Sequence, residues 1–186
     1  MVYKVYYFDD FVSDQSSILS FQNEYAVLKR SQVSDAKHLP HLLGVYIGVN
    51  HVALCMPKFE MDYREYLENH RDHRHLGRIL LMVIDGLNEL HEMGYVHRDL
   101  KPDNIGINLK PLYACVIDFD RAQLRTQATK GTILGSPGYF PNFDRLPDGS
   151  TRWDVWALAA IVLESDMEPG AYRNASSERG SLTRAD

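Results

Sequence analysis

The chain has 186 residues, enough for one globular domain with a hydrophobic core. Its formal net charge of −5 argues against a general nucleic-acid binder, and no apolar run is long enough to cross a membrane. The N-terminus lacks a signal-peptide pattern, and the two cysteines, Cys55 and Cys115, lie in apolar runs typical of reduced, buried thiols. We therefore expect an intracellular, cytoplasmic protein without a disulfide framework and without nucleic-acid or membrane partners.

The N-terminal half alternates between strand and helix patterns. Residues 2–8 are aromatic and β-branched, which predicts a strand, and the polar residues 9–17 predict a loop. Residues 18–30 predict a helix, because their apolar side chains recur at the spacing of one helical face: Phe21, Tyr25 and Leu28. Residues 44–56 then predict two strands joined by a turn near Gly48-Val49-Asn50.

The C-terminal half is predicted to be mainly helical. Residues 76–93 follow an amphipathic helical pattern that Gly94 ends in the position of a C-terminal cap. Residues 153–164 are apolar nearly all round, so we expect a buried helix. Residues 174–186 are polar and offer little to pack, which is typical of a frayed tail. The order of elements indicates an α+β fold.

The most informative stretch is the run His97-Arg98-Asp99-Leu100-Lys101-Pro102-Asp103-Asn104. Phosphoryl transfer needs an acid that orients the attacking hydroxyl, a cation on the transferring phosphate and an oxygen ligand for magnesium. Asp99, Lys101 and Asn104 offer these three functions within six residues. The run therefore predicts a catalytic loop.

Three segments downstream support this interpretation. A β-rich stretch ends in Asp118-Phe119-Asp120, where Asp118 is a second oxygen ligand suited to magnesium. The segment Gly135-Ser136-Pro137-Gly138-Tyr139 follows, and Trp153-Asp154-Val155-Trp156 begins the apolar helix.

These four signatures, in this order, resemble those of eukaryotic protein kinases of the serine/threonine type, whose catalytic loop reads H-R-D-L-K-x-x-N. The resemblance implies a protein-kinase-like α+β fold over residues 1–165. Its parts are a small β-rich N-lobe remnant over about 1–56, a hinge over about 56–60 and a mainly helical C-lobe over about 61–165. Residues 166–186 are left as a polar tail.

The resemblance also assigns roles around ATP and Mg²⁺. Asp99 would align the substrate hydroxyl, and Lys101 would neutralise charge on the γ-phosphate. Asn104 and Asp118 would bind Mg²⁺. His97 is expected to pack with the phenyl ring that follows Asp118.

Further nucleotide contacts are expected from the N-lobe. Lys4 fits the strand lysine that holds the α- and β-phosphates, and Glu24 lies at the separation of its glutamate partner. Cys55 takes the gatekeeper place in this alignment, so the C=O of Met56 and the N–H of Lys58 would bind adenine. The alternative for Lys4 is a solvated strand face, and for Cys55 a small core residue.

The chain departs from the family pattern in three places. The family's glycine-rich loop lies upstream of its strand lysine, and only three residues precede Lys4. Asp120 replaces the glycine of the D-F-G motif, and Phe140-Pro141-Asn142-Phe143 stands where kinases carry a glutamate that pairs with a distant arginine. These departures indicate a kinase domain truncated at both ends, with apolar C-lobe surface that a protein partner would cover.

Two function classes stay open on these residues. The first is an ATP-dependent kinase that phosphorylates a serine or threonine of a protein substrate. The second is a non-catalytic pseudokinase-like scaffold or a truncated kinase fragment that acts by protein binding. A small-molecule phosphotransferase would share the Asp and Asn but should lack the Lys101 context, so it ranks third.

Two more patterns bear on regulation and on false matches. Arg98 precedes the catalytic Asp99 as in kinases activated by phosphorylation, and a phosphothreonine would pair with it; the candidates are Thr126, Thr129 and Thr132. His70-Arg71-Asp72 also spells H-R-D, but no lysine follows two residues later. We interpret this second copy as a solvated loop and not as a metal or catalytic site.

Overall fold

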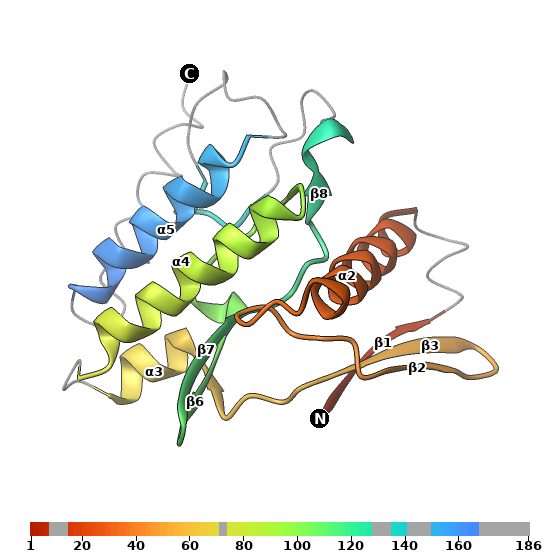
Figure 1. Ribbon diagram of the computed structural model, residues 1–186, viewed down its shortest axis with the longest axis horizontal. Coiled ribbons are helices and arrows are strands. Elements are labelled where there is room, and N and C mark those ends of the chain that lie inside the picture. Colours follow the sequence, from red (N-terminus) through yellow and green to blue (C-terminus); the bar gives the residue numbers. More distant parts are fainter. Residues whose placement is uncertain (8–14, 71–73, 128–134, 141–149, 168–186) are drawn as a thin grey trace, which may run out of the picture.

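A computed structural model describes residues 1–7, 15–70, 74–127, 135–140 and 150–167. Figure 1 shows two parts, a small sheet with one long helix on the right and a mainly helical part on the left. This mixture of helices and strands matches the predicted α+β fold class. The proposed tail, residues 166–186, falls almost wholly outside the described residues.

The smaller part is a three-stranded antiparallel sheet of order β1-β3-β2, formed by β1 (Val2–Tyr7), β2 (Gly44–Ile47) and β3 (His51–Met56). The helix α2 (Gln15–Ser34) packs on one face of this sheet, where the ring centroid of Phe21 lies 5.3 Å from that of Tyr6, and its Val27 and Leu28 are buried in the core. The helix is longer than the predicted 18–30, and residues 15–17, expected in a loop, are helical. Packing of the apolar side stabilises the helix as a whole, so its first turn can consist of polar residues.

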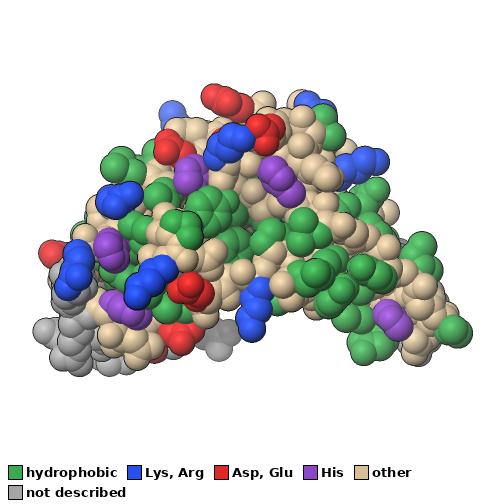
Figure 2. Space-filling view, turned by 60° about the horizontal axis from the view of Figure 1, so that its bottom comes forward, with side chains coloured by type: hydrophobic (Ala, Val, Ile, Leu, Met, Phe, Trp, Pro, Cys, Tyr) green, Lys and Arg blue, Asp and Glu red, His purple; other side chains and the backbone are tan. Residues whose placement is uncertain are grey.

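Side chains alternate between the two faces of this sheet. Lys4 pairs with Leu54 and Val2 pairs with Met56 in the antiparallel register. The residues on the face toward α2 join the core: Tyr6, Val52, Leu54 and Met56. On the opposite face, aromatic and aliphatic side chains are exposed: Tyr3, Val5, Tyr7 and Tyr46. Figure 2 shows hydrophobic side chains gathered on the side of the molecule that carries the sheet.

The larger part is built on three helices: α3 (Tyr63–Asn69), α4 (Leu76–Glu92) and α5 (Arg152–Ser165). The apolar face of α4 is buried as predicted, and Gly94 ends the helix with a φ of 88°, a conformation that glycine adopts freely. The short strand β4 (Met61–Asp62) pairs with β6 (Ile105–Leu109), which pairs with β7 (Leu112–Val116). A two-stranded ribbon joins β5 (Tyr95–Val96) to β8 (Gln123–Leu124).

The helix α5 corrects one prediction. Trp153, Ala157 and Ile161 lie on its buried side, in line with the expected core helix. The other side is exposed, with Val155 at 58% and Leu163 at 62%, so the expectation of burial all round is wrong for the described structure. Apolar composition alone does not say on how many sides a helix is covered. No helix among the described residues is both long and apolar enough to cross a bilayer.

Candidate active site

A buried carboxylate on α5 fixes the predicted catalytic loop. Asp154 accepts hydrogen bonds from the backbone N–H of His97 at 2.8 Å and of Arg98 at 3.0 Å. The ring of His91 on α4 lies 2.7 Å from the same carboxylate. Arg98 has a φ of 68°, a costly backbone conformation for a residue with a side chain. The contacts with Asp154 hold the loop in this conformation.

Asp99 lies at the centre of a small polar cluster. Its carboxylate accepts a hydrogen bond from the hydroxyl of Ser136 at 2.8 Å. The ammonium of Lys101 donates to the same hydroxyl at 3.1 Å and lies 3.7 Å from Asp99. The side-chain amide of Asn104 donates to the backbone C=O of Asp99 at 2.8 Å, which fixes the amide beside the loop. The structure thus brings the three predicted catalytic residues together.

Ser136 was not predicted as part of this cluster. The sequence places it 37 residues after Asp99, in a segment that resembles the kinase pattern but to which the sequence assigns no residue role. A hydroxyl between a carboxylate and an ammonium occupies the kind of place that a substrate hydroxyl needs in phosphoryl transfer. The signal that could have identified Ser136 is its segment, the run Gly135 to Tyr139.

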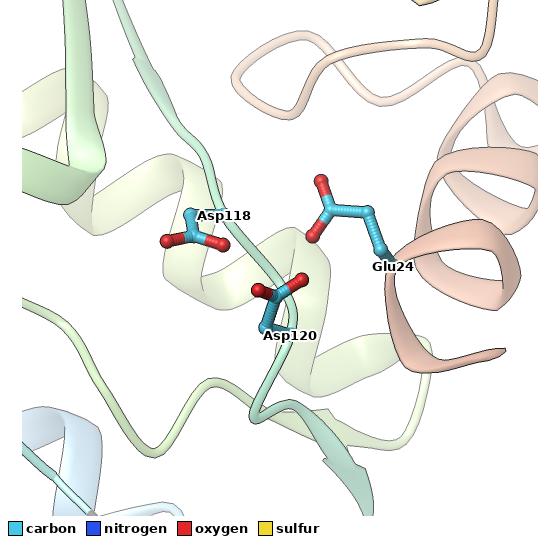
Figure 3. A group of neighbouring side chains, drawn as sticks. All are labelled: Glu24, Asp118 and Asp120. Atoms are coloured by element: carbon cyan, nitrogen blue, oxygen red, sulfur yellow. The ribbon is translucent and has the colours of Figure 1, made fainter. Parts of the chain in front are cut away.

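A second cluster surrounds Lys4 on β1. Its ammonium lies 2.6 Å from the carboxylate of Asp118, 2.6 Å from that of Asp120 and 3.5 Å from that of Glu24 on α2. Figure 3 shows the three carboxylates directed toward one common space, and one oxygen of each lies within 4.8 Å of the others. The structure therefore brings Lys4 and Glu24 together, as the sequence predicted, and adds Asp118, predicted as a magnesium ligand, and Asp120 to the same cluster.

The charges in this cluster shift one another's protonation. Burial raises the pKa of Glu24 to about 7, and the charges of Asp118 and Asp120 add to this, although Lys4 opposes it. Burial acts to lower the pKa of Lys4, but the nearby carboxylates outweigh it and hold that pKa above its ordinary value. Burial also opposes ionisation of Asp118, yet the Lys4 ammonium holds the pKa of Asp118 below its usual range. Lys4 and Asp118 are thus a charged pair.

Phe119 links the catalytic loop to the Lys4 cluster. Its side chain is fully buried, and its ring centroid lies 5.4 Å from that of His97, which is the packing that the sequence predicted. Its backbone N–H donates to Glu24. Among the described non-glycine residues with positive φ are Asp118, at 65°, and Arg98, but not Asp120. The aspartate in place of a glycine therefore costs no left-handed backbone strain here.

A comparison with protein families gives one decisive match, since a model described as "Protein kinase domain" matches residues 3–181. This chain belongs to the protein kinase family. The kinase chain is 31% identical over 173 residues to the serine/threonine-protein kinase PkaB of Streptomyces coelicolor, a match that covers 84% of this chain and 40% of PkaB. It is 30% identical over 158 residues to human calcium/calmodulin-dependent protein kinase type 1B, covering 75% of this chain and 42% of that kinase. The chain thus spans about 40% of the length of these two curated relatives.

The end of β3 differs from the prediction by one residue in the side chain that it directs to the Lys4 face of the sheet. Cys55 pairs with Tyr3, and both lie on the sheet face opposite Lys4. Met56, which pairs with Val2, lies on the same face as Lys4 and is buried. The prediction of Cys55 as gatekeeper is therefore wrong, because a shift of one residue in a strand reverses the face of every side chain. The connecting segment begins after Met56, and Lys58 within it is exposed.

The regulatory predictions are only partly within the described kinase structure. The guanidinium of Arg98 donates to Gln123 on β8 at 2.5 Å. Thr126 lies in a short 3₁₀ turn, Arg125–Gln127, whereas Thr129 and Thr132 lie outside the described residues. Of the second H-R-D copy, only His70 is described, and its ring stacks on Tyr66 at 4.9 Å, a packing contact at the end of α3.

Proposed function

We propose that this chain is an ATP-dependent protein kinase that transfers the γ-phosphate of Mg-ATP to a serine or threonine hydroxyl of a protein substrate. The observation that carries the proposal is the hydroxyl of Ser136, held between the carboxylate of Asp99 and the ammonium of Lys101. The same two groups would hold an incoming substrate hydroxyl, because an alcohol of the same kind already fits between them.

Each residue has a distinct role in this proposal. Asp99 orients the substrate hydroxyl and accepts its proton as the oxygen attacks the γ-phosphorus. Lys101 offsets the negative charge on the transferred phosphoryl group while the bond to the β-phosphate oxygen breaks. Lys4 binds the α- and β-phosphates, and Glu24 fixes its position from α2 at 3.5 Å.

The donor set suits a hard cation. The Asp118 carboxylate and the Asn104 amide oxygen are ligand types that Mg²⁺ prefers, and they would hold it in this site. Mg²⁺, when bound, would offset charge on the nucleotide phosphates.

The register of β3 also changes the proposed adenine contacts. The sequence assigned them to the C=O of Met56 and the N–H of Lys58, counted from Cys55 as gatekeeper. Counted from Met56, they become the C=O of Pro57 and the N–H of Phe59. Proline suits the first position because an acceptor there needs no N–H.

The first test is binding, measured as a thermal melt of the 186-residue chain with and without Mg-ATP. Ligand at about a hundred times its Kd should stabilise the fold by about 2.7 kcal/mol. Asp118→Ala should abolish the magnesium-dependent shift, whereas Asp85→Asn, a charge change on the exposed side of α4, should keep it. An unchanged shift in Asp118→Ala would contradict the assignment of Asp118.

The second test is transfer of labelled phosphate to serine- and threonine-containing peptides. Asp99→Asn should bind Mg-ATP like the unmodified chain but lose transfer, because the amide cannot accept the proton. Transfer that persists in Asp99→Asn would remove Asp99 from its role. A folded chain whose melting temperature does not change with Mg-ATP would favour the protein-binding alternative.

A further inference from the structure

Asp120 introduces a negative charge where the kinase D-F-G motif has a glycine. Its carboxylate lies 2.6 Å from the ammonium of Lys4, the same distance as the carboxylate of Asp118. A glycine at this position has no side chain that could pair with the Lys4 ammonium. The chain therefore supplies its phosphate-binding lysine with a partner that the motif lacks.

The structure holds Asp120 in place from two elements. The hydroxyl of Tyr6 on β1 donates to the Asp120 carboxylate at 3.1 Å. The side-chain amide of Asn23 on α2 donates to its backbone C=O at 2.9 Å. These contacts fix the carboxylate beside Lys4, so the ion pair is not an occasional contact of a free surface side chain.

The cluster holds more negative than positive charge. One ammonium, that of Lys4, faces the carboxylates of Glu24, Asp118 and Asp120. A nucleotide phosphate that approaches Lys4 must replace one of these oxygens and is repelled by the others. Of the three, Asp120 is the one that the family motif does not require.

We infer that Asp120 competes with the nucleotide phosphates for Lys4, and that this competition makes nucleotide binding depend on a divalent cation. The inference rests on the proposed function, in which Lys4 binds phosphate. Removing the charge of Asp120 frees Lys4 for the phosphates even when no divalent cation is present.

The experiment measures ATP binding by calorimetry, in EDTA and in excess Mg²⁺, for the unmodified chain and Asp120→Asn. Asparagine keeps the size of the side chain and an oxygen that can accept the hydrogen bond from the Tyr6 hydroxyl. We expect Asp120→Asn to bind ATP about tenfold more tightly in EDTA, which corresponds to about 1.4 kcal/mol. In Mg²⁺ the two Kd values should differ by less than about threefold, because the cation offsets the same charge. Asp120→Gly, which restores the motif residue, should behave in the same way.

Two controls separate action through Lys4 from other effects. Asp85→Asn removes an equal charge from α4, outside the cluster, and should leave the Kd in EDTA unchanged. Asp120→Asn in a Lys4→Met background should change ATP binding less than about twofold, since the group for which Asp120 competes is gone.

Each remaining outcome is decisive. An unchanged Kd in EDTA would overturn the proposed competition. A gain in ATP affinity that persists in the Lys4→Met background would overturn it too. Weaker Mg-ATP binding by Asp120→Asn would assign Asp120 to the cation and overturn it as well. A folded, unmodified chain that does not bind Mg-ATP would instead refute the proposed function.

Discussion

The carboxylate of Glu24 should make the stability of this kinase chain fall as the pH rises toward neutrality. The side chain is fully buried, and one of its oxygens, Oε1, has no hydrogen-bond partner among the described residues. Burial raises the pKa of Glu24 to about 7 from an ordinary value of 4.5. The folded state therefore keeps a proton that the unfolded chain releases at lower pH.

The sign and size of this pH effect on stability follow from the linkage between proton binding and folding. Between pH 4.5 and about 7 the folded state binds more protons at Glu24 than the unfolded state, so the free energy of unfolding decreases as the pH rises through this window. The gap between the two pKa values corresponds to about 3 kcal/mol. Above the folded-state pKa this contribution is constant. Glu24→Gln keeps an acceptor for the N–H of Phe119 but cannot titrate.

The measurement is urea unfolding of the unmodified chain and of Glu24→Gln, at about pH 5 and about pH 8. Between these conditions the unmodified chain should lose about 2.5 kcal/mol relative to Glu24→Gln, since pH 5 already lies above the unfolded-state pKa of 4.5. Glu68→Gln, an exposed change on α3, should follow the unmodified chain. Parallel pH profiles for the unmodified chain and Glu24→Gln would refute the reasoning.

Three other substitutions test the site and its supports. Asp154→Ala should cost about 3–5 kcal/mol in urea unfolding, because buried catalytic-loop N–H groups lose their acceptor; a loss below about 1 kcal/mol would contradict this role. Ser136→Ala should lower peptide phosphorylation about tenfold or more without a change in melting temperature, because it removes the hydroxyl that positions the Asp99 carboxylate and the Lys101 ammonium; Ser136→Thr should restore it, and full activity in the alanine variant would show that Asp99 does not need this hydroxyl. Arg64→Leu should destabilise the fold by about 3–5 kcal/mol, since it leaves the buried Glu164, now 2.7 Å from its guanidinium, without its cation; Arg64→Lys should lose less.

Contacts between residues close in sequence were accessible without a structure. The helix over residues 76–92 follows from its apolar period, and the catalytic loop from a motif whose functional groups lie within six residues. Such patterns are reliable because helical geometry and short loops fix where nearby side chains can lie.

Predictions that depended on long-range alignment were less accurate. The strand over residues 51–56 was recognised, but only the pairing register with β1 shows that Met56, and not Cys55, shares the sheet face of Lys4. Composition identified α5 as apolar, yet its exposed side depends on what packs around it.

The sequence by itself determined the protein kinase family, the catalytic loop and the residue types that suit phosphate and magnesium, because these are written in contiguous or evenly spaced residues. Only the tertiary structure decided that the hydroxyl of Ser136 meets Asp99 and that Asp120 shares Lys4 with Asp118, across 116 residues of chain. The physical reason is that side chains far apart in sequence meet only where packing of the two parts and strand register bring them together. The spacing of motifs along the sequence specifies neither this packing nor the strand register.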